Sequence, residues 1–123
     1  MNDNYDVRYA VGPRETIQMG TQALRNEFLI EQVFGIDKIK LVYSHYDRFI
    51  AGGVIPKKKL VGLQTIDPLK ADFFLERREM GIINVGGKGY VKADGETFSL
   101  EYKEALYLGR ATKEVSFSSD DIK

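Results

Sequence analysis

The chain has 123 residues, a length that allows one domain to bury a proper hydrophobic core. Its 18 basic and 18 acidic side chains give a formal net charge of zero, so composition offers no electrostatic reason to expect nucleic acid or a membrane as a partner. It has no cysteine, which excludes disulfides and thiolate chemistry, and no apolar run approaches the ~20 residues of a transmembrane helix. The polar amino terminus lacks the apolar core of a signal peptide, which favours a cytoplasmic protein.

The first part of the chain predicts an arm and one short helix. We expect residues 1–20 to form an irregular arm that runs over the surface or adds an edge strand. Thr21 can then cap the amino end of a helix, in which Leu24 and Phe28, four residues apart, share one face. The expected helix has one or two turns.

Beyond residue 35 the chain has the patterns of β-strands. Ile39, Leu41 and Tyr43 alternate with other side chains, which predicts a strand with one buried face. The apolar run FIAGGVIP follows, and two glycines inside a strand often mark a bulge or a sharp bend. The segment LVGLQTI predicts a further strand.

The segment from Phe73 to Phe117 predicts five short strands. Asp94-Gly95 separates YVKA from ETFSL and indicates a two-residue hairpin, because a type I′ turn needs positive φ at both positions. The glycines around Lys88 predict a tight turn rather than a phosphate loop, since a strand and not a helix follows them. Short strands at this spacing predict an all-β fold, either a sandwich or a barrel.

The same segment resembles the core of a cupin barrel. Its phrases FLERRE, INVGG and ALYLG resemble the amino-terminal half of 5-dehydro-4-deoxy-D-glucuronate isomerase, also named 4-deoxy-L-threo-5-hexosulose-uronate ketol-isomerase. The resemblance covers nearly the whole chain and includes LRNEFLIEQVF and LVYSHYDRFIAGGVIP. It implies one domain over residues 1–123, a cupin-like antiparallel β-barrel or jelly roll with one short helix.

What the resemblance implies beyond this chain is an enzyme of two cupin-like domains. Such an enzyme is a homo-hexamer that converts 5-dehydro-4-deoxy-D-glucuronate to 3-deoxy-D-glycero-2,5-hexodiulosonate, with zinc bound by histidines and a glutamate of its carboxy-terminal barrel. We therefore expect two partners for this chain: the missing carboxy-terminal domain and further copies of itself, as a dimer or larger assembly. Whether the chain is a fragment or a complete one-domain gene product stays open.

Cupins usually hold a metal through histidines, and these are missing at the matching positions. Glu79 and Gly86 have the spacing of the first cupin motif, which places its two histidines at Phe73 and Leu75 and a later one near Glu114. Hydrocarbon side chains cannot coordinate a metal. The prediction is no metal and no cofactor in this chain, with zinc only in the full-length family.

A small set of polar residues could carry chemistry without a metal. His45 and Glu79 are candidates for moving a proton, because imidazole and carboxylate side chains are common general acids and bases. Arg48, Arg77 and Arg78 are candidates for binding the carboxylate of a uronate ligand. On a strand, Arg77 and Glu79 would face one way and Arg78 the other, so a salt-bridge network is the alternative role of this cluster.

Three functions stay open on the sequence. The first is a structural and assembly domain of the isomerase without catalysis of its own. The second is a metal-free module that binds sugar acids through Arg77 or Arg78 with His45. The third is a metal-free catalytic barrel that acts through His45 and Glu79.

Overall fold

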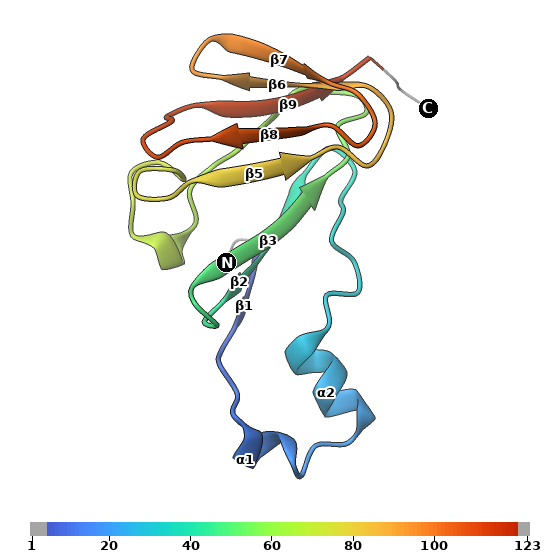
Figure 1. Cartoon of the computed structure of the whole chain (residues 1–123), viewed down its shortest axis with the longest axis vertical. Helices are drawn as coiled ribbons and strands as arrows, with labels where there is room; N and C mark the ends of the chain where they lie inside the picture. Colours follow the sequence, from blue (N-terminus) through green and yellow to red (C-terminus); the bar gives the residue numbers. More distant parts are fainter. Residues whose placement is uncertain (1–4, 121–123) are drawn as a thin grey trace. The chain divides into compact units, whose positions relative to one another are not determined.

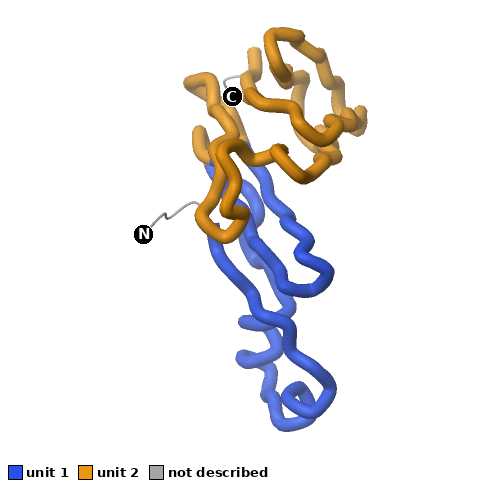
Figure 2. Tube along the Cα trace, turned by 90° about the vertical axis from the view of Figure 1, so that its left-hand side faces the viewer, with its two compact units in different colours: residues 1–35, 39–54 blue, residues 36–38, 55–123 orange. Residues whose placement is uncertain are grey.

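The structure is a computed structural model that describes residues 5–120 and is mostly β-strand, with 39% strand and 13% helix. This composition agrees with the predicted all-β, cupin-like fold. The chain divides into two compact units, which Figure 2 colours separately. One unit holds residues 5–35 and Ile39–Val54, and the other holds Ile36–Lys38 and residues 55–120.

The first unit is a three-stranded sheet with two short helices (Figure 1). Its elements are β1 (Tyr5–Arg8), α1 (Pro13–Thr16), α2 (Thr21–Phe28), β2 (Ile39–Ser44) and β3 (Phe49–Val54). Strand β2 is central: it pairs in parallel with β1 and antiparallel with β3. Leu41 and Tyr43 are buried on it, as their alternation predicts.

The amino-terminal part agrees with one expectation and differs from another. The predicted arm adds an edge strand, β1, as one of its two expected forms, and it also contains the single turn α1. The predicted helix is present as α2, but its N-cap is Gly20 and no side chain caps it; Thr21 is the first helical residue. No helix within residues 5–120 has the length and apolar character that crossing a membrane requires.

The glycines of β3 permit close approach of the backbone and do not form a bulge. The pairing of β2 with β3 runs without interruption from Ile39 opposite Val54 to Ser44 opposite Phe49. A Cβ atom on Gly52 would lie 2.4 Å from the carbonyl oxygen of Lys40, well inside van der Waals contact. The bulge prediction was therefore wrong, and the absent side chain has a steric reason.

The second unit consists of two antiparallel sheets (Figure 1). Its elements are β4 (Val61–Gly62), the 3₁₀ helix η1 (Asp67–Leu69), β5 (Met80–Ile83), β6 (Gly89–Ala93), β7 (Glu96–Leu100), β8 (Ala105–Leu108) and β9 (Val115–Ser119). The larger sheet has the order β4-β9-β6-β7, and β5 pairs with β8. The buried apolar residues of this unit are Val61, Ile66, Phe74, Leu75, Val91, Ala93, Leu100, Leu108 and Val115.

The hairpin between β6 and β7 forms as predicted. Asp94 and Gly95 have φ values of 49° and 88°, the positive angles of a type I′ turn. The Asp94 carboxylate also accepts hydrogen bonds from the backbone N–H groups of Lys113 and Glu114, at 3.0 and 2.8 Å. The turn residue thereby holds the loop that leads into β9.

Residues 73–79 do not form the strand that the sequence predicts. Residues 73–77 form turns and bends, residues 78 and 79 have no regular structure, and the first strand of the predicted five begins at Met80. The predicted alternation of side chains along this segment is therefore wrong. Likewise, the strand predicted for LVGLQTI is reduced to the two residues of β4.

Candidate functional site

His45 lies in the turn between β2 and β3, next to two aromatic rings. Its imidazole stacks on Tyr9, with ring centroids 4.6 Å apart and planes inclined by 12°, and it meets Tyr43 edge-on at 5.2 Å. Its backbone N–H donates to the carbonyl of Arg8 at 2.8 Å. Two tyrosines therefore orient the exposed imidazole, and no motif in the sequence singled them out. The acid/base role of His45 stays a prediction.

Arg48 is a turn residue of the same unit. Asp47 and Arg48 both have positive φ, 55° and 53°, and the N–H of Phe49 donates across the turn to Tyr46 at 3.3 Å. The two residues thus shape the β2–β3 turn through their backbone. Carboxylate binding by Arg48 stays a prediction.

In the second unit, Arg77 is bound to the backbone of the chain. Its Nη2 donates to the carbonyl oxygens of Leu69 and Lys70, both at 2.8 Å, and so ties the end of η1 to the turn at 73–79. Its neighbour Glu76 accepts a hydrogen bond from the backbone N–H of Asp72 at 2.8 Å. Two of the charged side chains in FLERRE, Glu76 and Arg77, therefore stabilise turns by binding backbone groups.

Glu79 pairs with a tyrosine from a distant strand. The hydroxyl of Tyr107, on β8, donates to Glu79 Oε2 at 2.6 Å. This hydrogen bond raises the pKa of Tyr107, because it favours the protonated phenol and the carboxylate disfavours a second negative charge beside it. Both side chains are exposed. The predicted catalytic role of Glu79 is not tested by this contact, which gives the carboxylate a structural partner.

The positions where cupin histidines would fall do not suit a zinc ion. Leu75 is 1% exposed and belongs to the core, and Phe73 is a partly buried hydrocarbon. Glu114 lies in the loop whose backbone binds Asp94. Within residues 5–120 no three side chains of histidine, cysteine, aspartate or glutamate gather where they could hold a metal.

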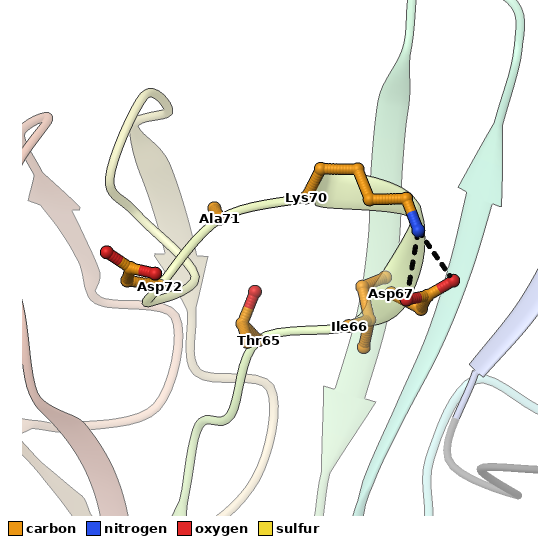
Figure 3. A pocket seen from close by; sticks show the side chains of 6 residues that line it. All are labelled: Thr65, Ile66, Asp67, Lys70, Ala71 and Asp72. Atoms are coloured by element: carbon orange, nitrogen blue, oxygen red, sulfur yellow. Dashed lines mark hydrogen bonds and ion pairs between the residues drawn. The ribbon is translucent and has the colours of Figure 1, made fainter.

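A shallow, polar depression lies beside η1 (Figure 3). It has a volume of about 350 Å³ and is lined by Thr65, Ile66, Asp67, Lys70, Ala71 and Asp72. The ammonium of Lys70 binds both carboxylate oxygens of Asp67 at 3.1 Å, so these two charges compensate each other. The Thr65 hydroxyl oxygen is buried and has no hydrogen-bond partner within the described part of the protein. Sequence reasoning missed this depression; its only local signal is Asp67-Pro68, which ends the preceding segment.

The predicted site residues thus form two groups. His45 and Arg48 belong to the β2–β3 turn of the first unit. The second group lies in the second unit, in the segment before β5, and consists of Arg77, Arg78 and Glu79. The residues that line the polar depression belong to the same unit. The fold and these groups define a β-sheet domain with exposed polar clusters and, over residues 5–120, no metal-binding cluster.

Comparison with known proteins gives the family. No family model matches the chain. A 4-deoxy-L-threo-5-hexosulose-uronate ketol-isomerase of Bacteroides fragilis is 51% identical over 121 residues, and one of Formosa agariphila is 53% identical over 121 residues. Each alignment covers 98% of this chain but 43% of the relative. A third, from Lachnoclostridium phytofermentans, is 47% identical over 116 residues, 94% of this chain and 42% of the relative.

The chain belongs to the 4-deoxy-L-threo-5-hexosulose-uronate ketol-isomerase family, and the resemblance stated from FLERRE, INVGG and ALYLG is confirmed. It spans less than half the length of the curated relatives that it matches.

Proposed function

We propose that this chain is the amino-terminal domain of a zinc-dependent ketol-isomerase that converts 5-dehydro-4-deoxy-D-glucuronate to 3-deoxy-D-glycero-2,5-hexodiulosonate, and that this domain supports structure and assembly. The observation that carries the proposal is the alignment with relatives of that name, which covers 98% of this chain and 43% of each relative. The hydrocarbon side chains at positions 73 and 75 support a role outside the metal centre. In this proposal the zinc ligands belong to the part of the relatives that the chain does not span.

Turnover of the uronate tests the proposal. The purified chain, with and without added zinc, is assayed beside the full-length relative from Bacteroides fragilis as the positive control. We expect turnover by the full-length enzyme and none above the buffer rate by this chain. Zinc-dependent turnover by the chain alone would overturn the structural role. If the full-length relative acts on a different substrate and does not convert the uronate, the proposed reaction is wrong.

The second candidate function is a metal-free module that binds sugar acids. It is favoured by the position of Arg77, whose guanidinium contacts the carbonyl of Lys70 at the rim of the polar depression. At this rim Arg77 would meet a carboxylate and Asp72 a hydroxyl group of the ligand, and Arg78 is the neighbouring candidate in the sequence. Titration calorimetry with galacturonate tests this function, with glucose as the uncharged control. Binding of galacturonate that Arg78→Gln weakens supports it, and no heat at millimolar ligand counts against it.

The proposal also places the protein in the cytoplasm and in an assembly of two or more copies. Zero net charge and the absence of cysteine from the sequence are compatible with that compartment. Exposed apolar side chains such as Tyr107 and Ile83 are compatible with association.

A further inference from the structure

The loop that follows β3 presents consecutive backbone N–H groups to one carboxylate. Asp37 Oδ1 accepts hydrogen bonds from the backbone N–H groups of Lys57 and Lys58 at 2.7 and 2.9 Å. Among the groups that lower the pKa of this carboxyl, the backbone N–H of Lys58 comes first, and those of Lys57 and Lys59 follow. Successive N–H groups that converge on one point form a concave anion-binding site, which is called a nest. We call Lys57, Lys58 and Lys59 the nest loop.

The side chains of the nest loop have the charge that suits an anion. All three are lysines, and Lys59 adds an electrostatic attraction to the Asp37 carboxylate. Lys57 is half-buried, whereas Lys58 and Lys59 are exposed, so the loop faces solvent. Asp37 and the nest loop belong to the same compact unit. Both the backbone and the charges of the loop therefore favour a carboxylate at this place.

The backbone of Asp37 is held in position without the help of its carboxylate. Its N–H donates to the carbonyl oxygen of Ile55 at 2.8 Å, and its neighbour Ile36 forms a β-bridge with Ile55. The φ angle of Asp37 is 55°, in the left-handed region that glycine adopts without strain. Asp37→Gly therefore keeps the path of the backbone and removes only a methylene and a carboxylate, the heavy atoms of one acetate ion.

We propose that the nest loop is a carboxylate-binding site and that Asp37 is its built-in ligand. In the parent protein the site is filled from within, so the three lysines do not offer an open site to a free sugar acid. When the Asp37 side chain is absent, acetate supplies the carboxylate from solution, and one of its oxygens accepts the N–H groups of Lys57 and Lys58. The inference does not depend on the isomerase assignment.

Chemical rescue with acetate tests the inference. Thermal unfolding of the parent, Asp37→Gly and Asp37→Asn is followed at neutral pH in sodium acetate, with sodium chloride at the same ionic strength as the salt control. Acetate should raise the midpoint of Asp37→Gly by several degrees relative to chloride, the shift that a ligand at about ten times its dissociation constant gives a domain of this size. The parent and Asp37→Asn should not respond, because a side-chain oxygen still fills the site. Acetamide, which has the shape of acetate without its charge, should stabilise Asp37→Gly less.

Backbone amide signals locate the binding of acetate. In nitrogen-15 spectra of Asp37→Gly, the signals of Lys57 and Lys58 should shift on addition of acetate and reach saturation. Equal responses of the parent, Asp37→Gly and Asp37→Asn to acetate overturn the inference. So do amide signals of the nest loop that stay in place, or an Asp37→Gly chain that acetate neither stabilises nor folds. Because neither experiment measures turnover, a failure here is distinct from a failure of the isomerase assignment.

Discussion

At the scale of single residues, Leu75 serves the core at a position where the cupin motif would have a ligand. Its side chain is 1% exposed, and its carbonyl accepts a hydrogen bond from the N–H of Ala111 at 2.7 Å. Burial in the core therefore explains why an apolar residue occupies position 75. The turn that contains it is attached to the loop before β9 through that hydrogen bond.

We predict that Leu75→Ala lowers the free energy of unfolding by about 2–5 kcal/mol, because it removes buried methyl groups and leaves a cavity. Leu60→Ala is the matched control, since Leu60 is 61% exposed, and its effect should stay within about 0.5 kcal/mol. Urea denaturation followed by circular dichroism measures both. Equal effects of the two substitutions would show that Leu75 is not a core residue.

Asp37 is the residue whose ionisation the fold most clearly favours. Its Oδ1 accepts the backbone N–H groups of Lys58 and Lys57 at 2.9 and 2.7 Å. These hydrogen bonds, that of Lys58 first, hold the pKa of the carboxyl below its ordinary value of 3.8 against a smaller opposing effect of desolvation. The carboxylate thereby fixes the loop that follows β3.

Because the pKa of Asp37 is lowered in the folded state, its contribution to the free energy of unfolding is larger at neutral pH than in acid. The stabilisation is fully present above pH 3.8, the ordinary value, and is lost as the pH falls through the lowered pKa of the folded state. Asp37→Asn should therefore be less stable than the parent at neutral pH, and the difference should shrink below pH 3.8. Urea midpoints from pH 2 to pH 7 measure this. A difference that stays constant with pH would contradict the account.

At the scale of elements, the β2–β3 hairpin has no space for a side chain at Gly52. Gly52→Ala would place its Cβ 2.4 Å from the Lys40 carbonyl oxygen and 2.7 Å from Leu41 Cδ2. We predict a loss of about 1–3 kcal/mol in the free energy of unfolding, the usual cost of overpacking. Gly62→Ala in β4 is the control, because nothing lies within 4 Å of its Cβ position. Similar thermal unfolding midpoints for both variants would rule out the steric explanation.

Local chemistry made some elements predictable from the sequence. The Asp94-Gly95 hairpin follows from the positive φ that its turn requires, and the alternation of Leu41 and Tyr43 follows from one buried face. The segment at 73–79 was not predictable in this way. Its turns depend on Arg77 reaching carbonyls seven and eight residues earlier and on Ala111, which is far along the chain.

The candidate site was less predictable than the fold for the same reason. The partner of Glu79 is Tyr107, 28 residues away, and the ring stacked on His45 is Tyr9. Strand pairing creates both contacts, and no local motif encodes them. The polar depression around Thr65 arises from the path of the chain through η1.

At the scale of the whole molecule, the chain is a part of a family whose curated members are longer. It shares about half of its residues with relatives named as uronate ketol-isomerases, and it spans 43% of their length. The described part has β-sheet cores and polar clusters and lacks a set of side chains that suits zinc. The central claim is that this part of the polypeptide supports an active site that lies elsewhere.

Zinc binding by the purified chain tests that claim most directly. Competition against a chromophoric chelator at neutral pH measures it, with the full-length relative from Bacteroides fragilis as the positive control. The account predicts that the chain takes no zinc from the chelator, whereas the full-length protein takes a stoichiometric amount. Stoichiometric binding of zinc by the 123-residue chain would contradict the account.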